Sequence, residues 1–249
     1  MSGHSKWSSI KHKKAAQDAR RGKLFTKLIR EVTVAARHGG GDPEANPRLR
    51  LAISQARGHN LPMDTINRAI AKGSGASEGE DYVEVIYEGY GPHNVAVVIE
   101  ALTDNRNRTI ASIRHTFGKH NGNLGATNSV QYMFERKGTL TVPKEGLDED
   151  ALTEYVLEGG GEDLEDQEDS FLVICPLEAF ESLRSLLEEK GVTIGSAELQ
   201  RLPQARVTLS SKEDAEKVLT FLEALEEDDD VQKVFSNLDI DEAILAELT

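Results

Sequence analysis

The chain has 249 residues, of which 43 are Asp or Glu and 29 are Lys or Arg, so its formal net charge at pH 7 is −14. Hydrophobic residues make up 38% and aromatic residues 5%, which favours several small domains over one domain with a large core. No apolar run approaches the roughly 18 residues that cross a bilayer, and the N-terminus has no apolar signal-peptide core, so we expect neither a membrane protein nor a secreted one but a cytoplasmic protein.

The charge is divided sharply along the chain. Residues 1–72 carry fifteen Lys and Arg against five Asp and Glu, a net charge of +10, which leaves −24 for residues 73–249. Solvated faces normally mix both signs, whereas residues 3–30 contain one acid and nine basic residues. We predict that this stretch binds nucleic acid, either DNA or RNA. The predicted contacts in it are Lys6, Trp7, Lys11, Lys13, Lys14, Arg20, Arg21, Lys23, Lys27 and Arg30.

The first part of this stretch is open to two interpretations. Residues 7–20 have a helical composition without an apolar stripe, which predicts a helix that is marginal alone and suited to folding on a partner. Trp7, the only Trp, stands beside Lys6. It is suited either to stacking on a base or to anchoring the N-terminal segment on the folded domain.

Three short amphipathic helices are predicted next. Apolar residues recur at helical spacing over 24–39, 47–58 and 62–73, and each segment ends at glycine. Asn46-Pro47 is typical of a helix start, with a cap followed by proline in the first turn. We expect a small bundle. The tight turn of a helix-turn-helix motif is not evident between any two of these helices, so sequence-specific reading of the major groove is not expected.

The composition changes after a Gly, Ser and Glu-rich linker at residues 74–81. Residues 139–202 follow the order strand-helix-strand-strand-helix-strand, which is typical of a ferredoxin-like fold. Residues 204–236 predict only a strand, a helix and a strand, too little for a domain. The segment before residue 139 is predicted to contain strands at 82–90, 95–102 and 130–134, a helix at 105–120 and a turn at 135–138.

We therefore predict an α+β protein of three domains. The first is a basic N-terminal segment with a helical bundle, residues 1–75. The second is a discontinuous α+β domain, residues 76–137 plus 204–249, and the third is a ferredoxin-like domain, residues 138–203, inserted into it. Sequential domains would contradict this arrangement.

A second basic group lies where a loop enters the helix predicted at 105–120. Arg106, Arg108 and Arg114 are basic residues within an otherwise acidic half of the chain. The start of a helix suits an anion, which makes these residues a candidate second contact with nucleic acid. The alternative is that Asp104 or Asn105 caps the helix and that the arginines are ordinary surface residues.

Catalytic and metal sites are not expected. The seven His residues show no ligand spacing with Cys or paired carboxylates, and the chain has no phosphate loop and no nucleophile motif. The acidic clusters at 162–169 and 226–230 suit either a hard cation or solvated loops, and we favour loops. Cys175, in an apolar run, is predicted to be a buried core residue. We predict a non-enzymatic protein that needs no cofactor and has no small-molecule substrate.

Several motifs resemble those of one family. The opening residues 1–14, MSGHSKWSSIKHKK, closely resemble the N-terminus of the YebC/PmpR family, and further matches follow along the whole chain. These are KLFTK at 23–27, GGDP at 40–43, NLPMD at 60–64, YEGYGP at 87–92 and DNRNRT at 104–109.

The resemblance implies three domains, a helical bundle and two α+β units. It also implies one of two roles. Some members of the family are described as cytoplasmic DNA-binding regulators of transcription. Others, including a mitochondrial relative, resemble translation factors that act at the ribosome and ease the synthesis of proline-rich sequences. Both roles use a polyanion, so the partner is DNA, ribosomal RNA in the ribosome, or both.

Overall fold

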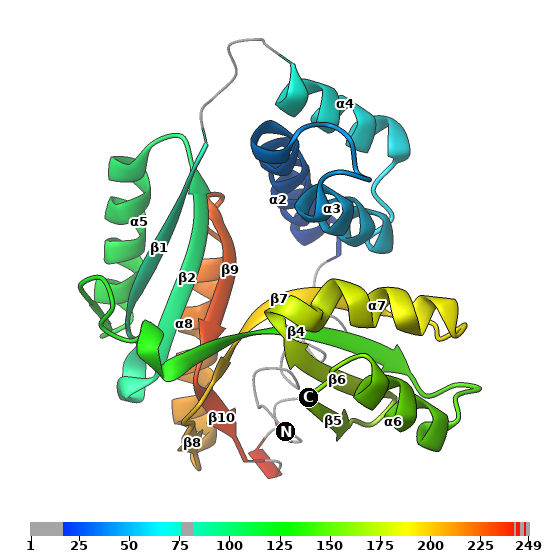
Figure 1. The fold of residues 1–249 in the computed structure, drawn as a ribbon. Coiled ribbons are helices and arrows are strands. Elements are labelled where there is room, and N and C mark those ends of the chain that lie inside the picture. Colours follow the sequence, from blue (N-terminus) through cyan, green and yellow to red (C-terminus); the bar gives the residue numbers. More distant parts are fainter. Residues whose placement is uncertain (1–16, 76–81, 242, 245–246, 248–249) are drawn as a thin grey trace. The chain divides into compact units, whose positions relative to one another are not determined.

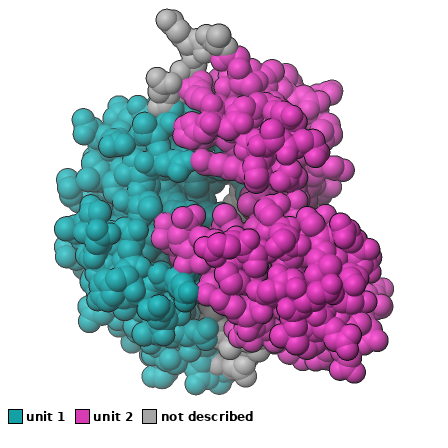
Figure 2. All heavy atoms as spheres, viewed as in Figure 1, with its two compact units in different colours: residues 1–31, 77–135, 202–249 teal, residues 32–76, 136–201 magenta. Residues whose placement is uncertain are grey.

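The structure is a computed structural model, and it describes residues 17–75, 82–241, 243–244 and 247. Its elements are mixed α and β, as predicted (Figure 1). The chain divides into two compact units, coloured separately in Figure 2. Unit 1 comprises residues 1–31, 77–135 and 202–249, and unit 2 comprises residues 32–76 and 136–201. The three-domain boundaries stay a prediction.

Unit 1 is built on an antiparallel sheet of strand order β3-β1-β2-β9. Its strands are β1 (Val83–Tyr90), β2 (Ala96–Thr103), β3 (Asn123–Leu124) and β9 (Val231–Ser236). The first two are joined by a short turn, η1 (Pro92–Asn94). A separate parallel pair joins β8 (Val207–Leu209) to β10 (Leu238–Ile240). The residues after 202 thus complete a sheet begun before residue 104.

Two helices cover one face of this sheet, α5 (Arg106–Lys119) and α8 (Lys212–Glu226). Alternate residues of β2, such as Val97 and Ile99, point into the shared core and are fully buried. Phe117 of α5 meets Phe221 of α8 edge to face, with ring centroids 5.0 Å apart. This contact joins the two helices, because aromatic pairs prefer such offset geometry and bury a large apolar area.

A buried carboxylate, that of Glu88, lies near the C-terminal end of β1 and organises the loop beside it. Glu88 is 1% exposed and accepts hydrogen bonds from the backbone N–H groups of Asn128 (2.5 Å), Val130 (2.8 Å) and Gln131 (3.0 Å), and from the Gln131 side chain (2.7 Å). These bonds fold residues 128–131 into a compact loop that continues as a 3₁₀ turn, η2 (Gln131–Met133). Glu88 is therefore the organising residue of this loop.

The same contacts explain two wrong predictions. A strand was expected over 130–134 and a turn over 135–138, but β4 runs without a break from Phe134 to Pro143. Val130 and Gln131 donate their N–H groups to Glu88, so those groups do not serve a strand ladder. The polar residues that suggested a turn, such as Glu135 and Arg136, are exposed on a strand instead.

Unit 2 contains a sheet of order β5-β6-β4-β7 with two helices, an arrangement that matches the predicted ferredoxin-like order. Its elements are β4, α6 (Glu149–Glu158), β5 (Asp163–Asp166), β6 (Ser170–Pro176), α7 (Phe180–Glu189) and β7 (Ser196–Pro203), with a short turn η3 (Leu177–Ala179) before α7. Cys175 is buried in β6 as predicted, and burial, with the charge of Glu162, raises the pKa of its thiol to about 11.

The helical part of unit 2 comprises the end of α2 (Gln17–Gly39), α3 (Pro47–Gly58) and α4 (Met63–Ser74). The helices α3 and α4 match those predicted over 47–58 and 62–73, whereas α2 begins at Gln17, seven residues before the predicted start at residue 24. Asn46 links two of them, because its side chain accepts the N–H of Leu49 and donates to the carbonyls of Ala35 and Gly40. One side chain thus caps the start of α3 and holds it to the end of α2.

Candidate nucleic-acid interface

The predicted nucleic-acid contacts fall into three groups in the structure. Lys6, Trp7, Lys11, Lys13 and Lys14 lie outside the described residues. The other N-terminal members lie on α2, where Arg20 belongs to the helical backbone. The third group lies on α5. Because residues 17–31 and α5 both belong to unit 1, contacts between these two groups can be described directly.

Three basic residues of α2 share one face and contact the end of α8. Lys23 donates to the carbonyl of Glu227 (3.0 Å), and Lys27 donates to that of Glu226 (2.6 Å). Arg30 donates to the carbonyl of Asp229 (2.7 Å). Helix C-termini present unpaired carbonyls and a partial negative charge, and α8 has no basic residue in its own last turn. The basic face of α2 supplies the missing cations.

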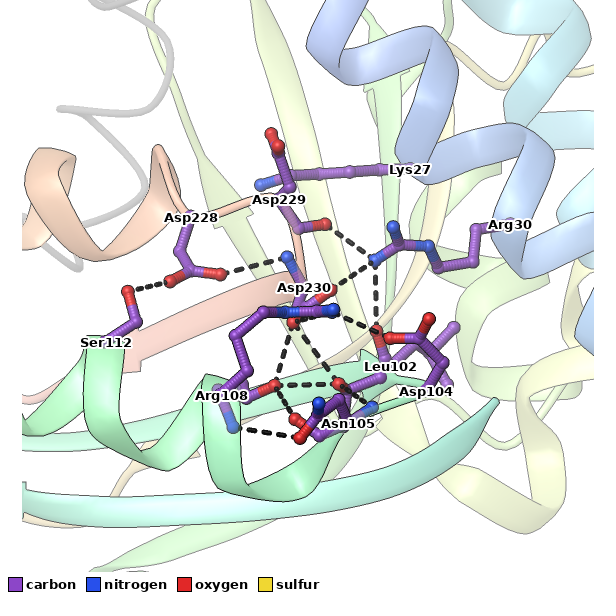
Figure 3. Close-up of polar contacts among 12 residues, drawn as sticks. Lys27, Arg30, Leu102, Asp104, Asn105, Arg108, Ser112, Asp228, Asp229 and Asp230 are labelled. Atoms are coloured by element: carbon purple, nitrogen blue, oxygen red, sulfur yellow. Dashed lines mark hydrogen bonds and ion pairs between the residues drawn. The ribbon is translucent and has the colours of Figure 1, made fainter. Parts of the chain in front are cut away.

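Asp230 is the centre of this cluster (Figure 3). Its carboxylate is buried and accepts hydrogen bonds from Arg108 (2.7 Å), Thr109 (2.8 Å), Thr103 (3.2 Å) and Arg30 (3.3 Å). These partners come from α2, β2 and α5, so one side chain of the loop after α8 connects three other elements. We call Asp230 and these four partners the Asp230 cluster.

The surroundings of Asp230 keep it ionised. Burial alone would raise the pKa of this carboxyl group, but hydrogen bonds from Arg108 and Thr109 and the charges of Arg108 and Arg30 outweigh it and lower the pKa below the ordinary value of 3.8. A buried carboxylate is stable only when it is paired in this way.

This lowered pKa gives a testable pH dependence. Because the folded-state pKa lies below the unfolded value, the cluster contributes stability that is present above pH about 4 and lost as the pH falls through the folded-state pKa. We expect the free energy of unfolding of the parent to fall more steeply below pH about 4 than that of Asp230→Asn, which cannot titrate. Urea unfolding at several pH values measures both slopes, and equal slopes would contradict the assignment.

Asn105 caps the start of α5, as the alternative interpretation of this basic group predicted. Asn105 accepts the backbone N–H of Arg108 through its side chain (3.1 Å), and Asp104 pairs with the Arg108 guanidinium (2.7 Å). Arg106 and Arg114 are exposed, and neither has a hydrogen bond or ion pair with the part of the chain that the structure describes. These two arginines are therefore available to an anion, whereas Arg108 has two carboxylate partners.

The structure thus separates the predicted basic residues by environment. Lys23, Lys27, Arg30 and Arg108 are engaged with acidic or carbonyl partners within unit 1. Arg21 is exposed, with its guanidinium 5.2 Å from the ring centroid of Phe25. Among the described residues, Arg21, Arg106 and Arg114 have no ion-pair partner that an anion would have to displace.

Sequence reasoning missed the role of the acidic loop. Residues 226–230 were expected to be a solvated loop, but Asp230 is buried and Asp228 accepts a hydrogen bond from Ser112 (2.5 Å). The available signal was the strand predicted over 231–236, because it places Asp230 directly before a strand whose Val231, Val234 and Phe235 are apolar. In the described residues, no group of His, Cys, Asp and Glu is arranged to hold a metal ion, and no helix there is long and apolar enough to cross a membrane.

Comparison with known proteins identifies close relatives along the whole chain. A model described as the TACO1/YebC protein N-terminal domain matches residues 5–76, and one described as the TACO1/YebC second and third domain matches residues 82–238. Similar curated proteins are named probable transcriptional regulatory protein. One from Pseudomonas fluorescens is 53% identical over all of both chains, and one from Desulforapulum autotrophicum is 51% identical over 98% of each.

A solved structure is similar as well. The crystal structure of a conserved hypothetical protein from Aquifex aeolicus has a TM-score of 0.83 and 50% sequence identity. The match covers 92% of this chain and 95% of that one. The similarity therefore extends over nearly the whole fold, beyond the N-terminal motifs.

Proposed function

Because the chain belongs to the TACO1/YebC family, we propose that it is a cytoplasmic, non-enzymatic regulator of gene expression that binds DNA through its basic N-terminal region. The observation that carries this proposal is the division of charge, +10 over residues 1–72 against −24 over the rest. A polyanion is attracted to one end of such a chain and repelled by the other, which orients it. The names of the curated relatives agree with regulation of transcription.

The second contact consists of Arg106 and Arg114 on α5. Both are exposed. Arg106 is the first residue of α5, where the positive end of the helix dipole adds to its charge and no acidic residue lies in the first turn, and Arg114 lies further along the same helix. Phosphate contacts of this kind provide affinity and salt dependence without reading sequence.

A ribosomal role is the alternative, and one observation favours it. Residues 7–20 have a helical composition without an apolar stripe, and six Lys and Arg residues lie between positions 6 and 21. Basic segments that lack an apolar face fold on structured RNA when they bind. In this role the same segment would contact ribosomal RNA, and DNA binding would be incidental.

Competition binding decides between the two. The full chain is incubated at physiological salt with ribosomes, ribosomal RNA fragments and promoter-sized duplex DNA, each displacing a labelled duplex. We expect duplex DNA to compete best. A preference of more than tenfold for ribosomes, lost when Lys11, Lys13, Lys14, Arg20 and Arg21 are changed to Ala, would establish the translation role instead. Failure of all three competitors to bind would overturn both proposals.

A further inference from the structure

The connection between α3 and α4 is a four-residue turn, His59–Pro62 (Figure 1). Leu61 donates its N–H to the carbonyl of Ala56 (2.9 Å), and Asn60 donates to that of Arg57 (2.9 Å). Asn60 has a φ of +60°, the left-handed conformation that closes a helix in this way. A connection of this length is typical of a helix-turn-helix motif, whose turn was not evident in the sequence because Asn60 occupies the position where glycine is the usual signal.

The inner face of α4 is packed tightly enough to fix its direction. Ile66 and Ala69 are buried, and Leu61 seals the turn beside them. A Cβ atom added to Gly73 would lie 2.2 Å from the carbonyl oxygen of Thr33 in α2, so these two helices are in backbone contact. A helix held at both ends by such contacts presents its outer face as a rigid surface.

The outer face of α4 carries side chains suited to base edges and phosphates. Its exposed residues fall on successive turns of one side: Met63, Asp64, Asn67, Arg68, Ala71, Lys72 and Ser74. Met63 is 47% exposed although it is a large apolar residue. Asp64 is the only acid among the twelve residues of the helix, and Arg57 adds another exposed cation just before the turn. By contrast, α8 begins with two acids in its first turn.

Building on the proposed function, we infer that α3, the turn and α4 form a helix-turn-helix reader and that α4 enters the major groove of duplex DNA. Asn67 is suited to a bidentate contact with adenine and Arg68 to one with guanine, while Lys72 and Arg57 contact phosphates. The occupant is B-form DNA because its major groove is about 12 Å wide and admits a helix, whereas the major groove of A-form RNA is too deep and narrow.

The test is affinity selection from duplex DNA with a randomised central segment. It uses the full chain and the double variant Asn67→Ala/Arg68→Ala. We expect the parent to enrich one sequence, and the variant to lose about 10- to 100-fold of the discrimination at one or two base pairs. Its affinity for unselected duplex should change far less, because the N-terminal basic residues remain. The control is Lys217→Ala/Thr220→Ala, which removes the same charge from the exposed face of α8 and should leave discrimination intact.

The outcomes separate this inference from the function it rests on. If the parent binds duplex DNA but enriches no sequence, or if the double variant keeps full discrimination, α4 is not a reader and the proposed DNA binding still stands. If the double variant loses affinity for structured ribosomal RNA rather than discrimination among duplexes, the face contacts RNA and the assignment to DNA is overturned. If the parent binds no nucleic acid, the proposed function fails first. Thermal unfolding should be unchanged in both variants, since all the altered side chains are exposed.

Discussion

Changing five basic residues near the N-terminus to Ala is expected to weaken binding to duplex DNA about a thousandfold at an ionic strength of about 0.15 M. Each phosphate contact releases counterions, which makes the logarithm of the affinity fall with the logarithm of the salt concentration by about 0.9 per contact. Losing five contacts should therefore reduce the magnitude of this slope by about 4.5. The altered residues are Lys11, Lys13, Lys14, Arg20 and Arg21.

A charge-matched variant provides the control for this experiment. Five Lys residues from the acidic part of the chain are changed to Ala, so the net charge falls by the same amount: Lys144, Lys190, Lys212, Lys217 and Lys233. We expect this variant to keep the parent slope. If both variants lose affinity equally, net charge rather than the N-terminal segment determines binding. An unchanged slope in the N-terminal variant would remove the main support for the proposed function.

The largest effect on stability is expected at Glu88. Changing it to Ala leaves the backbone N–H groups of Asn128, Val130 and Gln131 without their acceptor. An unpaired buried donor such as the Val130 N–H costs about 1–3 kcal/mol, and the partly buried donors of Asn128 and Gln131 add less, so we expect a total loss of unfolding free energy of about 3 kcal/mol. Urea unfolding measures this loss, and hydrogen exchange of the three amides should become fast in the variant.

Two further variants define the cause. Glu88→Gln keeps one oxygen acceptor and should lose less stability than Glu88→Ala. Glu84→Ala removes an exposed carboxylate from the same strand and should change the unfolding free energy by less than about 0.5 kcal/mol. Full protection of the Val130 amide in Glu88→Ala would show that the loop does not depend on this carboxylate.

Burial tends to raise the pKa of Glu88, yet the N–H donors outweigh it and lower the pKa below 4.5, so the acceptor is ionised at neutral pH.

The fold was predictable wherever apolar periodicity was strong. Ile113 and Phe117 of α5, and the apolar run of β6, occupy the positions that their spacing predicted. The failures lie where a distant residue decides local structure. Val130 and Phe134 are buried, as in a strand, but Glu88, some forty residues earlier, takes the backbone donors that a strand would need. The strands β3 and β10 were missed because two or three residues are too few to show an alternating pattern.

The candidate site was predictable only in its charge. The run of Lys and Arg near the N-terminus is visible in the sequence, but its contacts join residues about two hundred positions apart, such as Lys23 and Glu227. No local pattern reports such a pairing. Asp230 illustrates the same limit. Five consecutive acidic residues suggest a solvated loop, but Asp230, the last of them, is stable when buried because Arg30 and Arg108 donate hydrogen bonds to its carboxylate.

The position of the last segment has a consequence for synthesis on the ribosome. Unit 2 ends at residue 201, whereas the core of unit 1 includes Phe221 and Leu225 of α8, and its sheet includes Val234 of β9 paired with Ile99. Translation proceeds from the N-terminus, so every segment of unit 2 emerges from the exit tunnel before unit 1 can close its core. A chain truncated at residue 203 and released from the ribosome should therefore contain a protease-resistant unit 2 and an open β1–β2 hairpin, because the 46 residues that complete unit 1 are missing.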